Sequence, residues 1–300
     1  MLRTVYISFP GLGIEEFKLS NVAFTVFGHP IAWYGIIITF GIIMAALYVL
    51  YRAKQEGVIA DDVLDLGIYV VLFGVLGARL FFVLTSLDKF DTFWDIFKIW
   101  NGGLAIYGGI IGGLLAAYFV CKKVDLPFMK LLDLAGMSLL IGQGIGRWGN
   151  FTNQEAFGIN TDLPWGMTSE KVDAYINAHY SDLASSGIVM ESGSPVHPTF
   201  LYESIWCLLG FVVLYIVCKK FHKFDGQLIL GYGIIYGLER AVVEGLRTDS
   251  LYIGTSNIRV SQVVSLALVV SCALLTIVKI IQIKQEKEAV VKAYKEKNNV

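Results

Sequence analysis

The sequence predicts an all-α polytopic membrane protein of about seven transmembrane helices with a small extracytoplasmic head. Only 16% of the 300 residues are charged and 55% are hydrophobic, whereas a soluble domain carries about 25% charged residues. Seven apolar stretches are long enough to cross the hydrocarbon core as helices, which takes about 20 residues each. The one long polar insertion lies between residues 150 and 198.

Each apolar stretch is predicted to form one span. The spans cover residues 31–51, 66–85, 104–121, 131–149, 199–218, 227–245 and 260–283. The fourth and sixth are rich in glycine and carry arginine near one end, so neighbouring helices must shelter their polar side chains.

The segments outside the spans have distinct patterns. Aromatic and polar residues alternate between Phe17 and Phe27, which indicates a short strand or a surface segment. The insertion contains several glycines and prolines, and one short helix is predicted around Ser169–Ser186. The predicted order is an extracytoplasmic segment 1–30, four spans in 31–149, the head 150–198, three spans in 199–283 and a cytoplasmic tail 284–300.

Lysine and arginine are distributed unevenly between the two sides of the predicted bundle. Fourteen of them follow spans one, three, five and seven, and six lie on the opposite side. Cytoplasmic loops carry the excess of positive charge, so the N-terminus is expected outside and the C-terminus in the cytoplasm. The formal net charge of −1 favours no particular partner, and no nucleic-acid partner is expected.

The four cysteines lie inside or at the ends of apolar stretches and are Cys121, Cys207, Cys218 and Cys272. No two have the spacing of a metal-binding pair, so we predict neither a disulfide framework nor a metal site. Cysteines in such surroundings usually behave as small hydrophobic residues.

Four arginines lie in or at the edge of the spans, where a charged group marks a candidate functional site. They are Arg79, Arg147, Arg240 and Arg247. Arg240, Glu244 and Arg247 are spaced i, i+4 and i+7, which places them on one helical face. With the predicted topology, all four arginines lie near the outer headgroups. The simpler interpretations are an Arg240–Glu244 ion pair and snorkelling of Arg147 to the interface.

The arginines outnumber the carboxylates expected nearby, which are Glu155, Glu203 and Glu244. Surplus guanidinium in a low-dielectric cleft favours an anion, and its planar fork binds phosphate in a bidentate manner. A phospholipid headgroup is therefore a candidate ligand. Further polar candidates near the outer ends of the spans are Tyr34, Tyr107, Asn150, Asn153 and His197. A tyrosine at an interface is more often an aromatic-belt residue.

Several glycines are spaced four residues apart, which lets helix backbones approach closely. The pairs are Gly108/Gly112, Gly109/Gly113, Gly142/Gly146 and Gly233/Gly237. Tight helix packing is the role we expect for most of them.

Residues 146–158 read GRWGNFTNQEAFG and match the pattern G-R-x-G-N-F-x-N-x-E-x-x-G. With this signature the chain resembles the phosphatidylglycerol–prolipoprotein diacylglyceryl transferase family. Supporting matches run from the first span to the seventh: Trp33-Tyr34-Gly35, Gly77-Ala78-Arg79, Gly102-Gly103, His197-Pro198, Leu201-Tyr202-Glu203, and Arg240 with Glu244 and Arg247.

The resemblance implies a multi-pass enzyme of the bacterial plasma membrane whose active site lies near the outer leaflet. Such an enzyme joins the diacylglyceryl unit of phosphatidylglycerol to the lipobox cysteine of a preprolipoprotein, within the lipid bilayer and without a cofactor. It implies catalytic roles for Arg240, Glu244, Tyr34 and Tyr107. It implies phosphatidylglycerol-binding roles for Arg147, Asn150, Asn153, Glu155, Arg79, His197, Glu203 and Arg247.

One position departs from the family pattern. Many members have histidine directly before the Gly-Gly of span three, where this chain has Tyr107 before Gly108-Gly109. A phenol with a pKa near 10 is a poor base at neutral pH. Either Tyr107 only donates a hydrogen bond, or the base lies elsewhere, or the arginine field itself lowers the pKa of the substrate thiol. We favour the last of these hypotheses.

Two other classes of function stay open from sequence. An anion or lipid transporter would also carry buried arginines, but its charges would be spread through the bilayer or meet at the midplane. A non-catalytic phospholipid-binding protein would keep the same headgroup pocket and lack turnover.

Overall fold

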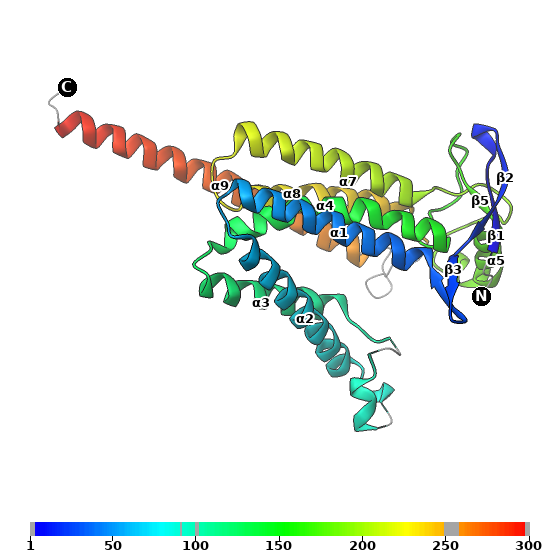
Figure 1. Ribbon diagram of the computed structural model, residues 1–300. Coiled ribbons are helices and arrows are strands. Elements are labelled where there is room, and N and C mark those ends of the chain that lie inside the picture. The colour runs from blue at the N-terminus through cyan, green and yellow to red at the C-terminus, as the bar shows by residue number, and fades with distance from the viewer. Residues whose placement is uncertain (1–3, 91, 100–101, 249–257, 298–300) are drawn as a thin grey trace. The chain divides into compact units, whose positions relative to one another are not determined.

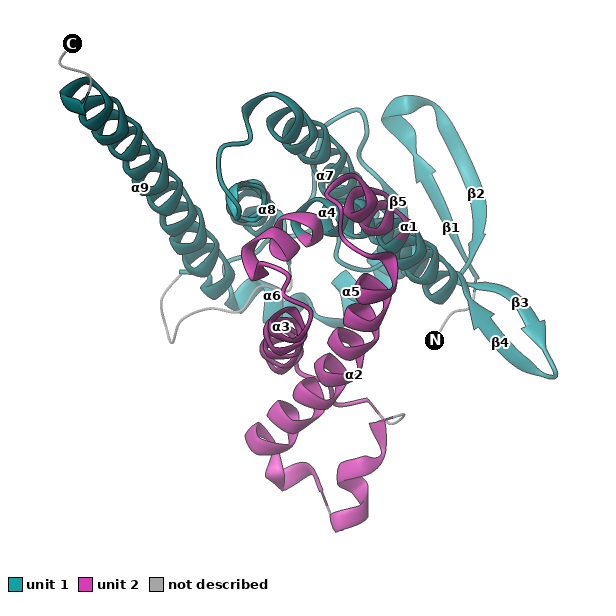
Figure 2. Ribbon diagram, turned by 60° about the vertical axis from the view of Figure 1, so that its left-hand side comes forward, with its two compact units in different colours: residues 1–46, 136–300 teal, residues 47–135 magenta. Residues whose placement is uncertain are grey.

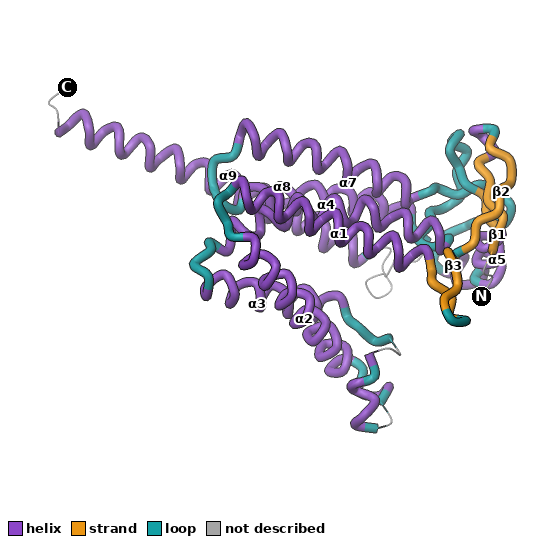
Figure 3. The backbone as a smooth tube through the Cα atoms, in the orientation of Figure 1, coloured by secondary structure: helices purple, strands orange, loops and turns teal. Residues whose placement is uncertain are grey.

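The computed structural model describes residues 4–90, 92–99, 102–248 and 258–297 of the chain. Helices dominate it (Figure 3). The long helices are α1 (Trp33–Gln55), α2 (Ala60–Thr85), α3 (Ile106–Lys123), α4 (Phe128–Asn153), α7 (Thr199–Ile216), α8 (Gln227–Leu246) and α9 (Val260–Lys297). The short helices are α5 (Glu170–Ala178) and α6 (Tyr180–Ser185), and the strands are β1 (Thr4–Phe9), β2 (Ile14–Ser20), β3 (Val22–Val26), β4 (His29–Ala32) and β5 (Thr168–Ser169).

The prediction of an all-α polytopic membrane protein is confirmed, with strands confined to the extramembrane part. Among the described residues, six helices are long and apolar enough to cross a membrane, namely α1, α2, α3, α4, α7 with its continuation to Phe221, and α9. The sixth predicted span is also a helix, α8. Its 20 residues include Glu239, Arg240 and Glu244, so length and composition alone do not mark it as a span.

The chain divides into two compact units, and each is described by itself (Figure 2). Unit 1 holds residues 1–46 and 136–300, and unit 2 holds residues 47–135. In unit 1, α1, α4 and α7 run side by side, with strands β1 to β4 at one end and the far end of α9 at the other (Figure 1).

Glycine brings the helices of unit 1 into close contact. A Cβ on Gly144 would lie 3.2 Å from Cys207 of α7, and one on Gly146 would lie 3.2 Å from Ile38 of α1. A Cβ on Gly237 of α8 would lie 2.7 Å from Val269 of α9. The site at Gly237 has no room for a side chain, and those at Gly144 and Gly146 would need the neighbouring residue to shift. The close-packing role expected of Gly146 and Gly237 is thus seen in the structure.

Unit 2 is built around the pair α2 and α3, which meet through backbone. A Cβ on Gly108 would lie 2.3 Å from the carbonyl oxygen of Gly77, and one on Gly112 would lie 2.3 Å from that of Phe73. The Gly108/Gly112 spacing thus forms the contact face of α3. At the far end of this pair, Leu66, Ala117, Cys121 and Leu131 form a small apolar cluster.

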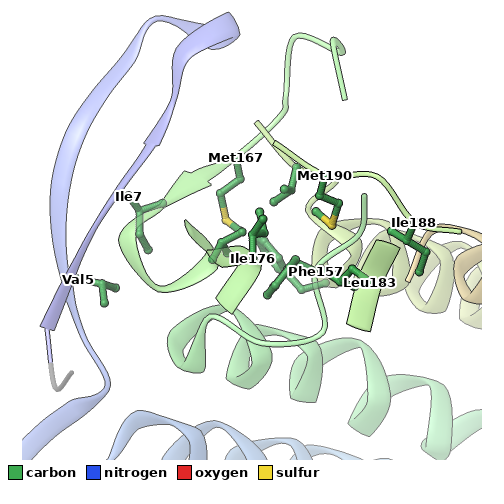
Figure 4. Packing of buried hydrophobic residues seen from close by; sticks show 11 residues of the cluster. Val5, Ile7, Phe157, Met167, Ile176, Leu183, Ile188 and Met190 are labelled. Atoms are coloured by element: carbon green, nitrogen blue, oxygen red, sulfur yellow. The ribbon is translucent and has the colours of Figure 1, made fainter. Parts of the chain in front are cut away.

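The head joins two segments that are far apart in the sequence. Strand β1 pairs antiparallel with both β2 and β5, so residues from the N-terminus and from the 150–198 insertion share one sheet. Its core includes Val5, Ile7, Phe157, Met167 and Ile176 (Figure 4). Alternation around Phe17–Phe27 correctly indicated strand, but it did not reveal this partnership.

Two elements differ in extent from the prediction. The single helix expected around Ser169–Ser186 is split into α5 and α6, because the backbone of His179 leaves the helical region with φ −115° and ψ 19°. The helix of the last predicted span extends past residue 283 into the predicted tail. This helix, α9, continues to Lys297, and i,i+4 pairs such as Lys284–Glu288 accompany its exposed turns.

Candidate functional site

Glu203 of α7 lies at the centre of a charged cluster in unit 1. Its side chain is 1% exposed, and its two carboxylate oxygens each face a different arginine. Arg147 of α4 places Nε 2.7 Å from Oε2, and Arg240 of α8 places Nη1 3.6 Å from Oε1. One buried carboxylate therefore connects two arginines from separate helices.

A second carboxylate holds Arg240 from its own helix. The Nη2 atom of Arg240 lies 2.6 Å from Oε2 of Glu244, which is the i,i+4 ion pair predicted from spacing. The carboxylates are 1% and 3% exposed, whereas the side chains of Arg147 and Arg240 are 21% and 20% exposed. The carboxylates are thus more deeply buried than the two arginine side chains, which stay partly accessible to an anion.

Glu239 is a member of this cluster that the sequence reasoning missed. It is 3% exposed, and its side chain contacts that of Glu203 directly. The signal available was a third charged residue in an otherwise apolar helix, next to Arg240. With Glu239 counted, Arg147, Arg240 and Arg247 face as many carboxyls, Glu203, Glu239 and Glu244. The sequence-based count of carboxylates, which used Glu155, Glu203 and Glu244, did not include Glu239.

The sequence around Arg147 explains how α4 brings it to this place. The neighbouring Gly149 packs against the ring of Tyr34 in α1, since a Cβ there would lie 2.9 Å from the ring atom Cδ2. Trp148 donates from Nε1 to Oγ of Ser204, at 3.2 Å, and stacks edge-on against Phe200 of α7. These contacts fix the rotation of α4 between α1 and α7.

The end of α4 forms a turn that presents Glu155. Gln154 and Ala156 both have positive φ, 49° and 57°, an unusual conformation for residues with a side chain. The turn returns the carboxylate to the helix end, where Oε1 accepts from Asn150 at 3.0 Å and Asn153 at 3.2 Å. The three residues of the signature thus form one polar group.

His197 belongs to a chain of hydrogen bonds between the head and α7. Trp165 donates from Nε1 to Oη of Tyr202 at 2.7 Å, and that oxygen lies 3.0 Å from Nδ1 of His197. All three groups are satisfied when Tyr202 donates to Nδ1, which puts the ring proton on Nε2. Burial lowers the pKa of His197, because the charged imidazolium loses hydration.

Arg247 follows α8 directly and joins it to the head. Its backbone is extended, with φ −73° and ψ 149°, and it pairs with Gly158 in an antiparallel bridge. Its charge acts on Glu203. Arg247 therefore lies just after the end of α8 and not on the helical face that its spacing predicted, but its charge still acts on the same cluster.

Arg79 lies in unit 2, and its environment differs from that of Arg147 and Arg240. It is 8% exposed, and its guanidinium donates to backbone carbonyls of the segment that follows α2. The acceptors are Asp95, Ile96, Lys98, Gly102 and Gly103. In this structure Arg79 organises that segment, and its lipid-binding role stays a prediction.

The two tyrosines given catalytic roles lie at helix starts. Tyr34 is the second residue of α1 and is 37% exposed, and Tyr107 is the second residue of α3 and is 61% exposed. Tyr34 shares unit 1 with the charged cluster. Tyr107 belongs to unit 2, and the catalytic roles of both tyrosines stay predictions.

Unit 1 also holds an apolar groove with a volume of about 350 Å³. Helices α1, α4 and α7 line it with Ile36, Ile37, Phe40, Gly144, Ile145, Trp148, Ser204 and Leu208. Trp148 and Ser204 are the immediate sequence neighbours of Arg147 and Glu203. Within the described parts of the chain, no three histidine, cysteine or acidic side chains gather as metal ligands would.

The fold and the cluster define a polytopic membrane protein with paired arginines at one end of its helices. The family model of prolipoprotein diacylglyceryl transferase matches residues 21–278. A phosphatidylglycerol–prolipoprotein diacylglyceryl transferase of Finegoldia magna is 41% identical over 91% of this chain and 98% of its own length. A relative with the same name in Thermotoga maritima is 41% identical over 85% of this chain and 83% of its own length. Another in Clostridioides difficile is 40% identical over 83% of this chain and 90% of its own length. The chain belongs to the prolipoprotein diacylglyceryl transferase family.

Proposed function

We propose that this protein transfers the diacylglyceryl group of phosphatidylglycerol to the lipobox cysteine of preprolipoproteins, in a bacterial plasma membrane. The observation that carries the proposal is the pair Arg147 and Arg240. Two guanidinium groups from separate helices are paired with buried carboxylates, and the side chains of Arg147 and Arg240 are each about a fifth exposed. A phosphodiester headgroup matches that charge and geometry.

The apolar groove supports a substrate with apolar chains. It lies against the segment of α4 that carries Arg147 and is lined mainly by hydrocarbon. A lipid held with its phosphate at the arginines would extend its acyl chains along such a surface. Phosphatidylglycerol combines the required anion with two such chains.

The reaction is a displacement at the primary carbon of the diacylglyceryl group. The thiolate sulfur forms a bond to that carbon while the carbon–oxygen bond to phosphate breaks, and glycerol phosphate leaves. Negative charge grows on the departing phosphate, and preorganised arginines stabilise it as it forms. The thiol must lose its proton first, and a cationic field favours that loss.

In this proposal Arg240, with Glu244 holding it, is nearest the leaving phosphate, and Arg147 binds the headgroup. The remaining predicted residues line the polar end of the site or hold its side chains in place. The head offers a surface for the lipobox peptide. The active site lies at the outer leaflet. The protein needs no nucleic-acid partner and no cofactor in this scheme.

The test is a transfer assay with the full-length protein in detergent or liposomes. Phosphatidylglycerol labelled in its acyl chains is mixed with a peptide that carries a lipobox cysteine. We expect label on the peptide and release of glycerol phosphate. Arg147→Ala should lower the rate by about 10²- to 10³-fold, whereas Lys292→Ala on the exposed tail of α9 should not.

Two results would count against the proposal. Equal transfer by Arg147→Ala and the native protein would remove Arg147 from the reaction. Binding of phosphatidylglycerol without any transfer would indicate a non-catalytic lipid-binding protein, and Tyr107 would then be the first residue to replace with histidine.

A further inference from the structure

Two buried carboxyl groups meet inside the cluster. Glu203 of α7 and Glu239 of α8 are 1% and 3% exposed, and their side chains contact one another. Among the described residues, Oε1 of Glu239 has no hydrogen-bond donor. Two carboxylates cannot hydrogen-bond to one another unless one of them carries a proton, because each offers only acceptors when ionised.

The charges around the pair come from three helices. Arg147 lies near it on α4, and the thiol of Cys207 lies near it on α7. Arg240 and the hydroxyls of Tyr232 and Tyr236 lie near it on α8, and the charge of Arg247, directly after α8, also acts on Glu203. The described ion pairs of Arg147 and Arg240 go to Glu203 and Glu244, and neither goes to Glu239. A second full negative charge on Glu239 would therefore lie against Glu203 without an ion-pair partner of its own.

We propose that Glu239 is a positioning residue that shares one proton with Glu203 and so keeps a negative charge away from the two arginines. The arginines then hold more of their positive charge for an anionic headgroup. Glu239 acts through Glu203, Arg147 and Arg240, without touching the lipid. The inference rests on the proposed function, since the headgroup is that of phosphatidylglycerol.

The proposal predicts a specific pH dependence. When the shared proton is lost in alkaline solution, the pair gains one negative charge next to the arginines and phosphatidylglycerol binding weakens. A single titrating proton makes the dissociation constant rise by about one decade per pH unit beyond that point. In Glu239→Gln the side-chain amide can still donate a hydrogen bond to Glu203. The amide does not ionise, so the pair cannot gain a second negative charge, and the weakening of phosphatidylglycerol binding at high pH should disappear.

The experiment measures binding of short-chain phosphatidylglycerol to the full-length protein in detergent, between about pH 6 and about pH 10. Binding is chosen because the substrate thiol, which also titrates, is absent. Glu288→Gln, on an exposed turn of α9, removes a carboxylate away from the cluster and should keep the native alkaline loss. A role in folding alone would shift affinity equally at every pH.

An infrared titration of the native protein gives a second measurement that does not depend on the variant folding. The stretching band of a protonated carboxyl should vanish at the pH where lipid binding weakens. Absence of such a band, or an alkaline loss in Glu239→Gln equal to that of the native protein, overturns the inference. If the native protein still transfers diacylglyceryl, the proposed function survives. If it binds no phosphatidylglycerol at any pH, the proposed function fails as well.

Discussion

Arg79 and Arg147 show how two arginines of similar sequence setting make different contacts. Both are preceded by glycine within one turn and lie at the ends of apolar helices. The donors of Arg79 meet the carbonyls of one irregular segment, so the side chain serves as the core of that segment. Arg147 meets one carboxylate and keeps an exposed edge. The guanidinium donors of the two arginines thus meet different partners, backbone carbonyls for Arg79 and a side-chain carboxylate for Arg147.

His197 gives a pH prediction at the scale of one residue. Burial lowers its pKa, so the folded protein binds this proton less readily than the unfolded chain does. The contribution of neutral His197 to the free energy of unfolding is fully present above the usual histidine pKa of about 6.5. It is lost as the pH falls through the lowered pKa of the folded protein. We expect the unfolding midpoint in detergent to fall in mild acid, and less steeply in His197→Asn. Equal slopes for both proteins would contradict this.

Sequence reasoning found most of the charged cluster but not its detailed contacts. The i,i+4 spacing predicts Arg240–Glu244, because that contact lies within one helix. The contacts of Arg147 and Glu239 with Glu203 cross between helices, and their sequence separations carry no period that would reveal them. Arg79 could not be understood from sequence, since its acceptors are backbone carbonyls in a segment without a repeating pattern.

At the scale of elements, close glycine contacts decide which helices can pair. In unit 2, α2 and α3 approach until the backbone at Gly77 meets Gly108. The i,i+4 glycine spacing predicted such contacts, but not which helix supplies the partner. The head shows the same limit, because no local pattern in β1 reveals that it pairs with β5.

Gly108→Ala is expected to separate α2 from α3. Its Cβ would lie 2.3 Å from the carbonyl oxygen of Gly77 and 2.4 Å from Cβ of Phe81. Overpacking of this kind costs about 1–3 kcal/mol, measured as a lower unfolding midpoint in detergent. Gly67→Ala in α2 is the matched control, since its Cβ meets nothing within 4 Å. An unchanged midpoint for Gly108→Ala would show that the helices shift without cost.

At the scale of the whole chain, the lysine and arginine bias predicts opposite sides for the head and the tail. Within unit 1 the head strands and the end of α9 lie at opposite ends (Figure 1). In intact bacteria, a membrane-impermeant thiol reagent should label Ser192→Cys in the head but not Lys292→Cys in the tail. In permeabilised cells the reagent should label both variants. Labelling of the native protein measures the background from its own four cysteines. The reverse pattern in intact cells would invert the topology.

The length of α9 also has a mechanical consequence. At 1.5 Å per residue its 38 residues measure about 57 Å, nearly twice a hydrocarbon core of about 30 Å. Its first half packs against α8, the helix that carries Arg240 and Glu244, through Gly233 and Gly237. Beyond Cys272, about 25 residues of α9 lie past the glycine contacts with α8. By geometry, a tilt of about 10° at Cys272 would carry Lys297 through about 7 Å, so a small change in how α9 packs on α8 is expected to give a larger displacement at Lys297.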